Sequence, residues 1–188
     1  MDQNLIIEPL GPNHDRAAFS CGKDQLDDYL KKQARNSVEK NLVAVFILTP
    51  DRKKIAGYYT LSSYAVITKD IPDEIAKKLT RMNEVPATLI GRLARSLEFR
   101  GAGLGEILLV DALKRAAKQS SIVASWAVIV DAKDDEAALF YKRYGFIQFP
   151  TKSHRLFIPM STVSGMYNSE IDEAAAPATP NQKAEPIS

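Results

Sequence analysis

The sequence predicts a single domain of the α/β (α+β) class, built around one central sheet. Apolar runs typical of strands alternate along the chain with segments whose apolar residues recur at helical spacing. Residues 122–130 are apolar without alternation, which indicates burial on both faces and hence a parallel neighbour. Residues 91–118 read as a strand, a glycine-rich turn and an amphipathic helix, and the other elements are arranged around this unit.

The first half of the chain is expected to supply strands, a long helix and a hairpin. Within residues 23–40, Leu26, Leu30, Ala34 and Val38 repeat every four residues, which predicts a helix with one apolar face. The other elements expected in this half are a strand at 4–10, a hairpin of strands 42–48 and 55–65, and a short helix at 72–79.

The basic residues of the long helix have two interpretations. Acidic residues lie near its start and basic ones near its end, as the helix dipole favours, so a solvated helix face is sufficient explanation. A nucleic-acid contact by Lys32, Arg35 and Lys40 is the alternative.

In the second half, strands and helices continue to alternate up to residue 159. We expect strands at 93–99, 122–130, 146–149 and 155–159, and helices at 104–118 and 134–144, the latter stopped by Gly145. From Thr162 the apolar pattern fails. The domain is therefore placed at 1–161, and 162–188 is expected to be a flexible acidic, Ala/Pro-containing tail.

Composition limits the class of protein. The 188 residues, 45% hydrophobic and 26% charged, are those of an ordinary globular protein. No apolar run approaches the ~18 residues of a membrane span and the N-terminus lacks a basic signal-peptide start, so a cytoplasmic location without a membrane partner is expected. Cys21 is the single cysteine and there are two histidines, so no metal site is expected. The net charge of +2 permits a polyanionic partner without requiring one.

The turn Arg100-Gly101-Ala102-Gly103-Leu104-Gly105 is the first candidate binding site. Three alternating glycines allow positive φ and a close approach of backbone to ligand. The helix that follows directs free N–H groups at the turn, and Arg100 adds a full charge, so the turn suits a pyrophosphate. The spacing fits neither a dinucleotide fingerprint nor a P-loop. A tight strand–helix connection without a ligand is the alternative.

At these residues the chain resembles the GNAT N-acetyltransferases. Arg100-x-x-Gly103-x-Gly105 looks like the family's acetyl-CoA motif. A second stretch, from Asp134 through Ala137 and Tyr141 to Gly145-Phe146, looks like its N-x-x-A-x-x-F/L-Y-x-x-x-G-F signature, with Asp134 in place of Asn. The resemblance covers roughly residues 4–161. It implies a mixed, mainly antiparallel sheet of six to seven strands with about four helices, splayed between the two central parallel strands.

The resemblance also implies which residues contact acetyl-CoA. The cofactor-binding residues it indicates are Leu93, Ala94, Arg95, Arg100, Gly101, Ala102, Gly103, Leu104, Gly105 and Glu106. A backbone N–H at Leu93 or Ala94 would polarise the thioester carbonyl. Tyr141, at the family's tyrosine position, is the implied acid that protonates the departing thiolate, with Tyr144 as the fallback. A core tyrosine is the alternative for Tyr141.

No general base is evident, because Glu84 and Glu98 have no distinguishing context. An α-amino group with a pKa of about 7.8 is about one quarter neutral near pH ~7.4, whereas a lysine amine with a pKa of about 10.4 is almost wholly charged. An amine beside an ester is more acidic still. Such an acceptor needs little more than water to remove its proton.

Further stretches resemble the GNAT toxins of bacterial toxin–antitoxin pairs. They are Phe19-x-Cys21-Gly22 with Leu26-Asp27-x-Tyr29-Leu30, Gly57-Tyr58-Tyr59, Gly91-Arg92-Leu93-Ala94, Asp131-Ala132-Lys133 and Arg155-Leu156-Phe157. That group acetylates the amino acid of aminoacyl-tRNA, blocks translation, is neutralised by a ribbon-helix-helix antitoxin and forms homodimers. Many relatives read Leu-Ala-Val-Asp where this chain has Leu93-Ala94-Arg95-Ser96. Arg95 is therefore expected either to alter the acceptor pocket or to point toward RNA.

Three functions follow from the sequence. The first is a toxin that acetylates aminoacyl-tRNA. The second is an acetyltransferase of a small-molecule amine or a protein N-terminus. The third is a non-catalytic acetyl-CoA-binding or corepressor module on the same fold. The sequence does not distinguish which tRNA or amino acid is modified.

Overall fold

The computed structural model describes residues 5–79 and 82–175, and in this part of the chain seven strands form one sheet. The strand order is β1-β2-β3-β4-β5-β7-β6. All neighbours are antiparallel except β4 and β5, which pair in parallel, as residues 122–130 predicted. The strands are β1 (Ile6–Pro9), β2 (Ala44–Thr49), β3 (Gly57–Ile67), β4 (Glu84–Arg95), β5 (Ala127–Asp131), β6 (Ile147–Phe149) and β7 (Lys152–Pro159).

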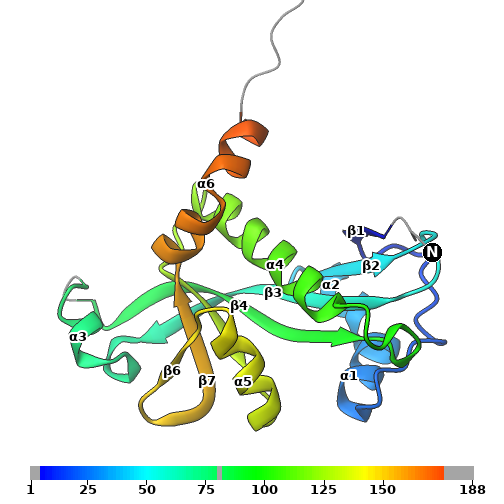
Figure 1. Cartoon of the computed structure of the whole chain (residues 1–188), viewed down its shortest axis with the longest axis horizontal. Coiled ribbons are helices and arrows are strands. Elements are labelled where there is room, and N and C mark those ends of the chain that lie inside the picture. The colour runs from blue at the N-terminus through cyan, green and yellow to red at the C-terminus, as the bar shows by residue number, and fades with distance from the viewer. Residues whose placement is uncertain (1–4, 80–81, 176–188) are drawn as a thin grey trace, which may run out of the picture.

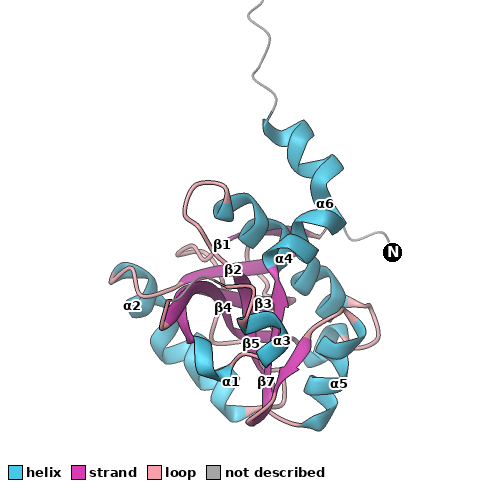
Figure 2. Cartoon of the chain, turned by 90° about the vertical axis from the view of Figure 1, so that its left-hand side faces the viewer, coloured by secondary structure: helices cyan, strands magenta, loops and turns pink. Residues whose placement is uncertain are grey.

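Helices cover both faces of the sheet (Figures 1 and 2). On one face, α4, α5 and α6 enclose a core that includes Leu108, Val128 and Tyr141. On the other face, α1 and α2 cover a core that includes Tyr58 and Ala94, and α3 lies over a third cluster. The helices are α1 (Asp24–Asp28), α2 (Ala34–Glu39), α3 (Asp73–Ala76), α4 (Leu104–Ser120), α5 (Asp135–Arg143) and α6 (Met160–Ala175), with 3-10 turns η2 (Thr68–Asp70) and η3 (Leu97–Phe99).

The helix expected at 23–40 is present but contains a π-helical turn, η1 (Tyr29–Gln33), between α1 and α2. The amide of Ala34 bonds to the carbonyl of Tyr29, five residues back. This extra residue in one turn places Tyr29, Leu30 and Ala34 together in the core. Such π-turns occur preferentially at functional sites.

The central strand is longer at its start, and shorter at its end, than the sequence predicted. It begins at Glu84 and stops at Arg95, so the expected strand at 93–99 is wrong beyond Arg95. The hydroxyl of Ser96 accepts a hydrogen bond from the amide of Glu98 and starts the 3-10 turn η3 instead. Local capping therefore prevailed over the apolar pattern.

The two central strands separate, as the resemblance implied. β4 pairs with β5 only through Thr88–Ile90, opposite Val128–Val130. Beyond Ile90, β4 stays paired with β3, but a β-bulge leaves Gly91 without a partner in the register. The edge of β4 from Arg92 to Arg95 therefore faces an opening in the sheet.

Two further expectations differ from the structure. Ile122 and Val123, expected to begin a strand, are 76% and 62% exposed in the turn after α4, because their amides bond to the carbonyl of Gln119 and only Ala127–Asp131 forms β5. Residues 162–175, expected to be flexible tail, belong to α6, which projects from the body (Figure 1). Val163 is fully buried and Lys114 lies over the ring of Tyr167, which fixes the base of α6 on α4. The rest of the expected tail, 176–188, lies outside the described residues.

Candidate active site

The glycine turn has the conformation that its sequence predicted. Gly101 and Gly103 adopt φ of +85° and +68°, and Gly103 is the N-cap of α4. A Cβ at either position would meet nothing within 4 Å, so the backbone here borders open space. The amides of Leu104 and Gly105 precede the first helical hydrogen bond, which Glu106 donates to the carbonyl of Gly103. Open backbone, free amides and the helix dipole together fit a diphosphate.

The predicted cofactor-binding residues lie in the glycine turn and at the end of β4, where Leu93 and Leu104 join the core under α4 and Ala94 joins the core on the opposite face. From Arg100 to Gly103 the chain is exposed, Leu104 is buried, Gly105 is half-buried and Glu106 is exposed; on β4, Ala94 is buried and Leu93 and Arg95 are half-buried. A depression of about 450 Å³, lined by Pro50, Asp51, Lys54, Glu98 and Phe99, adjoins Arg100. Its lysine lies 5.7 Å from the ring centroid of Phe99.

The register indicates which backbone groups of β4 face the opening. The amide of Ser96 bonds to the carbonyl of Ala56, toward β3. Because N–H direction alternates along a strand, the amide of Ala94 also faces β3, whereas those of Leu93 and Arg95 face the opening. Of the two expected amides, Leu93 is thus the one directed at a ligand between the strands. The side chain of Leu93 packs on the α4 face, and alternation places Arg95 on that face too.

Tyr141 lies on α5, in the same core cluster as Leu104 and, at the edge of that cluster, Leu93. It is 7% exposed, and its ring packs against Phe140 and Phe146, with centroids 5.2 and 5.4 Å away. Its hydroxyl donates to no other residue in the part of the chain that the structure describes. Burial alone raises the pKa of Tyr141 well above its ordinary value of 10.0, so the phenol stays protonated at neutral pH.

Two side chains of α5 lie close to the glycine turn. A Cβ on Gly105 would lie 3.7 Å from the ring of Phe140, an ordinary van der Waals distance, so α5 packs directly against the start of α4. Partial burial and the nearby carboxylate of Glu106 raise the pKa of Tyr144. The ring of Tyr144 packs against Phe140, with centroids 5.1 Å apart, which gives Tyr144 a structural role on α5. Tyr141 is therefore the better candidate acid.

Asp134, where the family signature has Asn, is the N-cap of α5 and accepts a hydrogen bond from the amide of Ala137 at 2.8 Å. That bond holds the pKa of Asp134 below its ordinary value of 3.8. A depressed pKa in the folded state means that the stabilisation is present above 3.8 and is lost as the pH falls through the folded value.

We therefore expect Asp134→Asn, which keeps an acceptor oxygen, to unfold thermally at a temperature close to wild type at pH ~7. Asp134→Ala, which has no acceptor, should unfold at a lower temperature. Between about pH 4 and 2 the wild type should lose more stability than Asp134→Asn, because only its cap becomes protonated. If the wild type and Asp134→Asn lose the same stability over this pH range, the Asp134 carboxylate does not have this role.

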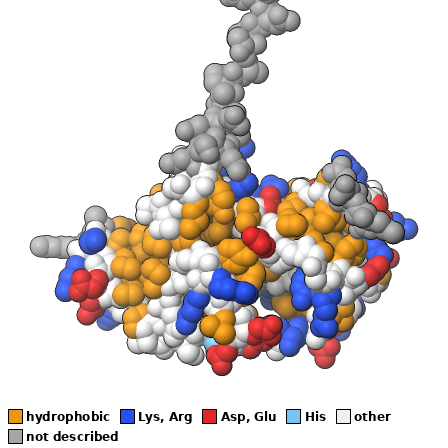
Figure 3. Space-filling view, viewed as in Figure 1, with side chains coloured by type: hydrophobic (Ala, Val, Ile, Leu, Met, Phe, Trp, Pro, Cys, Tyr) orange, Lys and Arg blue, Asp and Glu red, His pale blue; other side chains and the backbone are white. Residues whose placement is uncertain are grey.

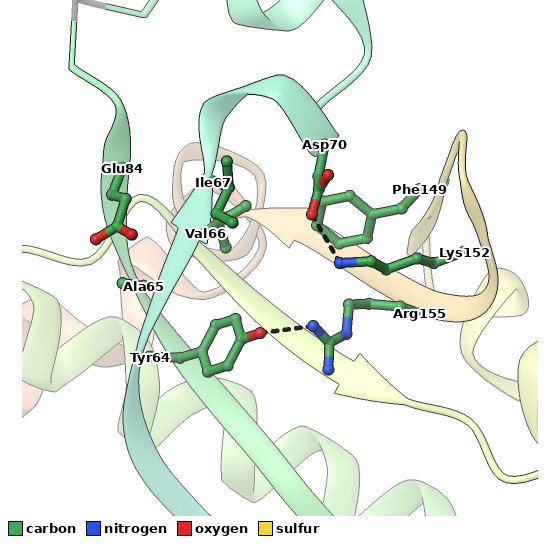
Figure 4. A pocket seen from close by; sticks show the side chains of 9 residues that line it. All are labelled: Tyr64, Ala65, Val66, Ile67, Asp70, Glu84, Phe149, Lys152 and Arg155. Carbon is green, nitrogen blue, oxygen red and sulfur yellow. Dashed lines mark hydrogen bonds and ion pairs between the residues drawn. The ribbon is translucent and has the colours of Figure 1, made fainter.

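A network at the open end of β5 was not assigned a role from the sequence. Arg155 donates to both carboxylate oxygens of Asp131, at 2.6 and 2.8 Å, and to the hydroxyl of Tyr64 at 2.5 Å. The Asp131 carboxylate is the main reason that the pKa of Arg155 is raised. These residues link β3, β5 and β7 beside a pocket of about 150 Å³ (Figure 4). The stretches that begin at Asp131 and Arg155 were both visible in the sequence, but the pairing of these two residues depends on β5 and β7 being neighbours in the sheet.

The remaining candidates have local partners. Lys32 pairs with Asp28 and Arg35 with Glu39, each one turn away, which favours the solvated-face interpretation. Glu98 pairs with Lys54. Burial, above all, raises the pKa of Cys21 to about 11, so this thiol is a poor nucleophile. On the face in Figure 3, basic and acidic side chains are interspersed.

Two searches of the described residues have a bearing on function. No helix among them is both long and apolar enough to cross a bilayer. Nor do residues 5–79 and 82–175 bring together three or more His, Cys, Asp or Glu side chains that could hold a metal ion.

A glycine turn that fits a diphosphate, separated central strands and a buried phenol are features expected of an acyl-CoA-dependent transferase, and the family model agrees. Residues 13–146 match the acetyltransferase (GNAT) family, and the chain belongs to it.

Its relatives include toxins. The chain is 32% identical over 170 residues to a protein described as "Probable toxin TacT" of Sinorhizobium fredii, covering 86% of this chain and 94% of that one. It is 33% identical over 146 residues to a "tRNA-acetylating toxin" of Mycobacterium tuberculosis, covering 78% and 86%. Among solved structures, a tyrosine-to-phenylalanine mutant of KacT has a TM-score of 0.81 at 27% identity, covering 86% of this chain and 98% of that one. AtaT complexed with acetyl-methionyl-tRNAfMet has a TM-score of 0.80 at 27% identity, covering 87% and 99%.

Proposed function

We propose that this protein is a toxin that transfers an acetyl group from acetyl-CoA to the amino group of an aminoacyl-tRNA. The single observation that carries the proposal is the opening between β4 and β5. In support, Leu104 of the glycine turn, Tyr141 and Leu93 from the unpaired edge of β4 meet in one core cluster, in a chain similar along most of its length to a tRNA-acetylating toxin. A relative, AtaT, has been solved with acetyl-methionyl-tRNAfMet, and the AtaTR complex with acetyl-CoA.

Acetyl-CoA enters from the α4 face. Its diphosphate binds the amides around Gly103 and the guanidinium of Arg100, which neutralises charge without requiring a metal. The pantetheine arm lies along the open edge of β4 in the position of a missing strand. The amide of Leu93 then donates to the thioester carbonyl and stabilises the negative charge that develops on its oxygen.

Transfer is one direct substitution at the thioester carbon. The neutral amine forms a C–N bond, the C–S bond breaks, and the departing thiolate takes the proton of the Tyr141 hydroxyl. The amine loses its proton to water, and water returns a proton to the phenolate. At ordinary pKa values of about 10 and 8.5, phenol-to-thiolate transfer costs about 2 kcal/mol. Burial raises the pKa of the phenol, and it disfavours a free thiolate in the same site for the same reason.

The test is to incubate the purified protein with acetyl-CoA and bulk charged tRNA, then to look for N-acetylated aminoacyl ends by mass spectrometry. We expect acetylation that weakens steeply with salt, because charged tRNA is held partly through its phosphates. Acetylation of free amines or protein N-termini at comparable rates, with little salt dependence, would favour the second function. Acetyl-CoA binding without any turnover would favour the non-catalytic module.

A cytoplasmic location, a ribbon-helix-helix antitoxin and a homodimer complete the proposal. The support is by relationship: a toxin of this fold has been solved bound to the C-terminus of the antitoxin AtaR. If the adjacent reading frame encodes a short DNA-binding protein, its co-expression should relieve growth arrest and yield a copurifying complex. Light scattering should then give twice the chain mass for the isolated protein.

A further inference from the structure

Two sequence stretches that the acetyl-CoA site does not use meet on the face of the sheet that α1 and α2 cover, opposite α4. Tyr29 belongs to the stretch that begins at Leu26, and Arg92 lies in Gly91-Arg92-Leu93-Ala94. The Arg92 guanidinium lies 3.6 Å from the centroid of the Tyr29 ring, which on its other side stacks on Tyr58. The three groups form a column from the core to the surface between α1 and β4.

The bulge at Gly91 decides which face Arg92 occupies. Val85, Ala87 and Leu89 alternate onto the face that α1, α2 and α3 cover. Without the bulge, Arg92 would fall on the α4 face; with Gly91 unpaired, Arg92 and Ala94 return to the α1–α2 face. Arg95 remains on the other side. The chain thus aims one guanidinium at each face of the opening.

Arg92 is a half-buried cation without a local counter-ion. It makes no ion pair with any residue in 5–79 or 82–175, in contrast to Lys32, Arg35, Arg115 and Arg155, each of which has a carboxylate partner. Arg92 is only half-buried, so its guanidinium remains accessible to a partner from outside the chain, and a partly desolvated cation favours an anionic one.

We propose that Arg92 binds a phosphate at the 3′ end of the acceptor RNA and that Tyr29 is the positioning residue that holds its guanidinium there. The inference rests on the proposed function. Tyr141 and the glycine turn lie on the α4 face, which the proposed function assigns to acetyl-CoA, so the α1–α2 face is the one left for the acceptor. Arg92 lies on that face, directly before the amide of Leu93. A guanidinium matches a phosphodiester with two parallel hydrogen bonds, which a lysine cannot reproduce.

The test compares Arg92→Gln and Arg92→Lys with wild type on two acceptors. On charged tRNA, Arg92→Gln should raise KM roughly ten- to hundredfold with kcat little changed, and should reduce the salt slope by about one. The KM of Arg92→Lys should lie between those of the wild type and Arg92→Gln. On aminoacyl-adenosine, which has no phosphate, all three should have equal kcat/KM. Acetyl-CoA affinity should be unchanged, which also reports on folding.

The matched control is Arg35→Gln on α2, where the guanidinium is exposed and paired with Glu39. It should leave KM near the wild-type value; an equal loss there would assign binding to the whole basic helix instead of Arg92. Tyr29→Leu, which removes the ring, should raise KM like Arg92→Gln and should not add to it in the double variant. Tyr29→Phe, which keeps the ring, should preserve most of the contribution of Arg92 to binding, so its KM should stay much closer to wild type than that of Tyr29→Leu. Additive losses, or equal losses on both acceptors, would overturn the proposal.

Failure of the proposed function gives a different result. If the wild type leaves charged tRNA unmodified, that function is wrong, and the Arg92 inference is decided by the Kd of an uncharged RNA hairpin ending in CCA. A Kd at least tenfold weaker for Arg92→Gln supports the phosphate contact. Equal affinities overturn it.

Discussion

Tyr141→Phe should lower kcat for acetyl transfer by roughly 10²- to 10⁴-fold, the range typical for loss of a positioned general acid. The substitution removes one hydroxyl from a side chain that packs between Phe140 and Phe146, so the ring contacts remain. Because the hydroxyl has no partner in residues 5–79 or 82–175, its loss leaves no described group unpaired. Folding and acetyl-CoA affinity should therefore stay close to wild type. Stopped-flow release of CoA, with a thiol reagent, measures the effect directly.

The pH profile supplies a second readout. Burial raises the pKa of Tyr141, so the phenol remains protonated throughout the neutral range and no basic limb below about pH 10 should arise from it. Any change of rate with pH near pH ~8 should instead come from ionisation of the acceptor amine. The residual activity of Tyr141→Phe should show the same pH dependence there. Tyr144→Phe is the matched control, and its kcat should fall far less. A profile whose limb disappears with Tyr141→Phe would contradict the proposed protonation state.

Gly103→Ala should weaken acetyl-CoA binding at least tenfold while destabilising the fold by only about 1–2 kcal/mol, the cost of a left-handed conformation for a residue with a Cβ. Gly103 has φ +68°, and an added methyl group would contact nothing in the described protein. It would instead occupy the open space in which the diphosphate binds. Isothermal titration with CoA and urea unfolding separate the two effects.

Gly165→Ala is the matched control for this substitution. Gly165 lies in α6, also has open space around an added Cβ, and does not have a positive φ. It should gain stability, by up to about 1 kcal/mol, with CoA affinity unchanged. If Gly103→Ala binds CoA as tightly as Gly165→Ala does, the turn is only a tight connection between strand and helix.

Much of the fold follows from local pattern. The unbroken apolar run at residues 122–130 predicted burial on both faces, and β5, which takes up its second half, is central and parallel to β4. Gly145, expected to stop a helix, has φ +85° directly after α5. The turn at Gly101 and Gly103 has the positive φ that its glycines suggested. These are features that a few neighbouring residues determine among themselves.

The errors arose where other contacts overrode the apolar pattern, through short-range hydrogen bonds at Ser96 and after α4, and through tertiary packing in α6. The apolar run that suggested a strand from Ile122 begins with two residues, Ile122 and Val123, that lie exposed in the turn after α4. The apparent tail becomes a helix because Val163 and Tyr167, four residues apart, meet the surface of α4. Neither outcome is encoded in the segment alone.

The sequence by itself therefore determined the class of fold, the family and the conformation of the glycine turn, because each depends on contiguous residues with a fixed spacing. Only the tertiary structure decided that Asp131 and Arg155 pair, that the edge of β4 after Ile90 is left unpaired by β5, and that Arg92 stacks on Tyr29 on the face away from Arg95. The physical reason is that sheet register and a single-residue bulge fix the direction of every side chain and amide on β4, and both depend on strands far apart in the chain.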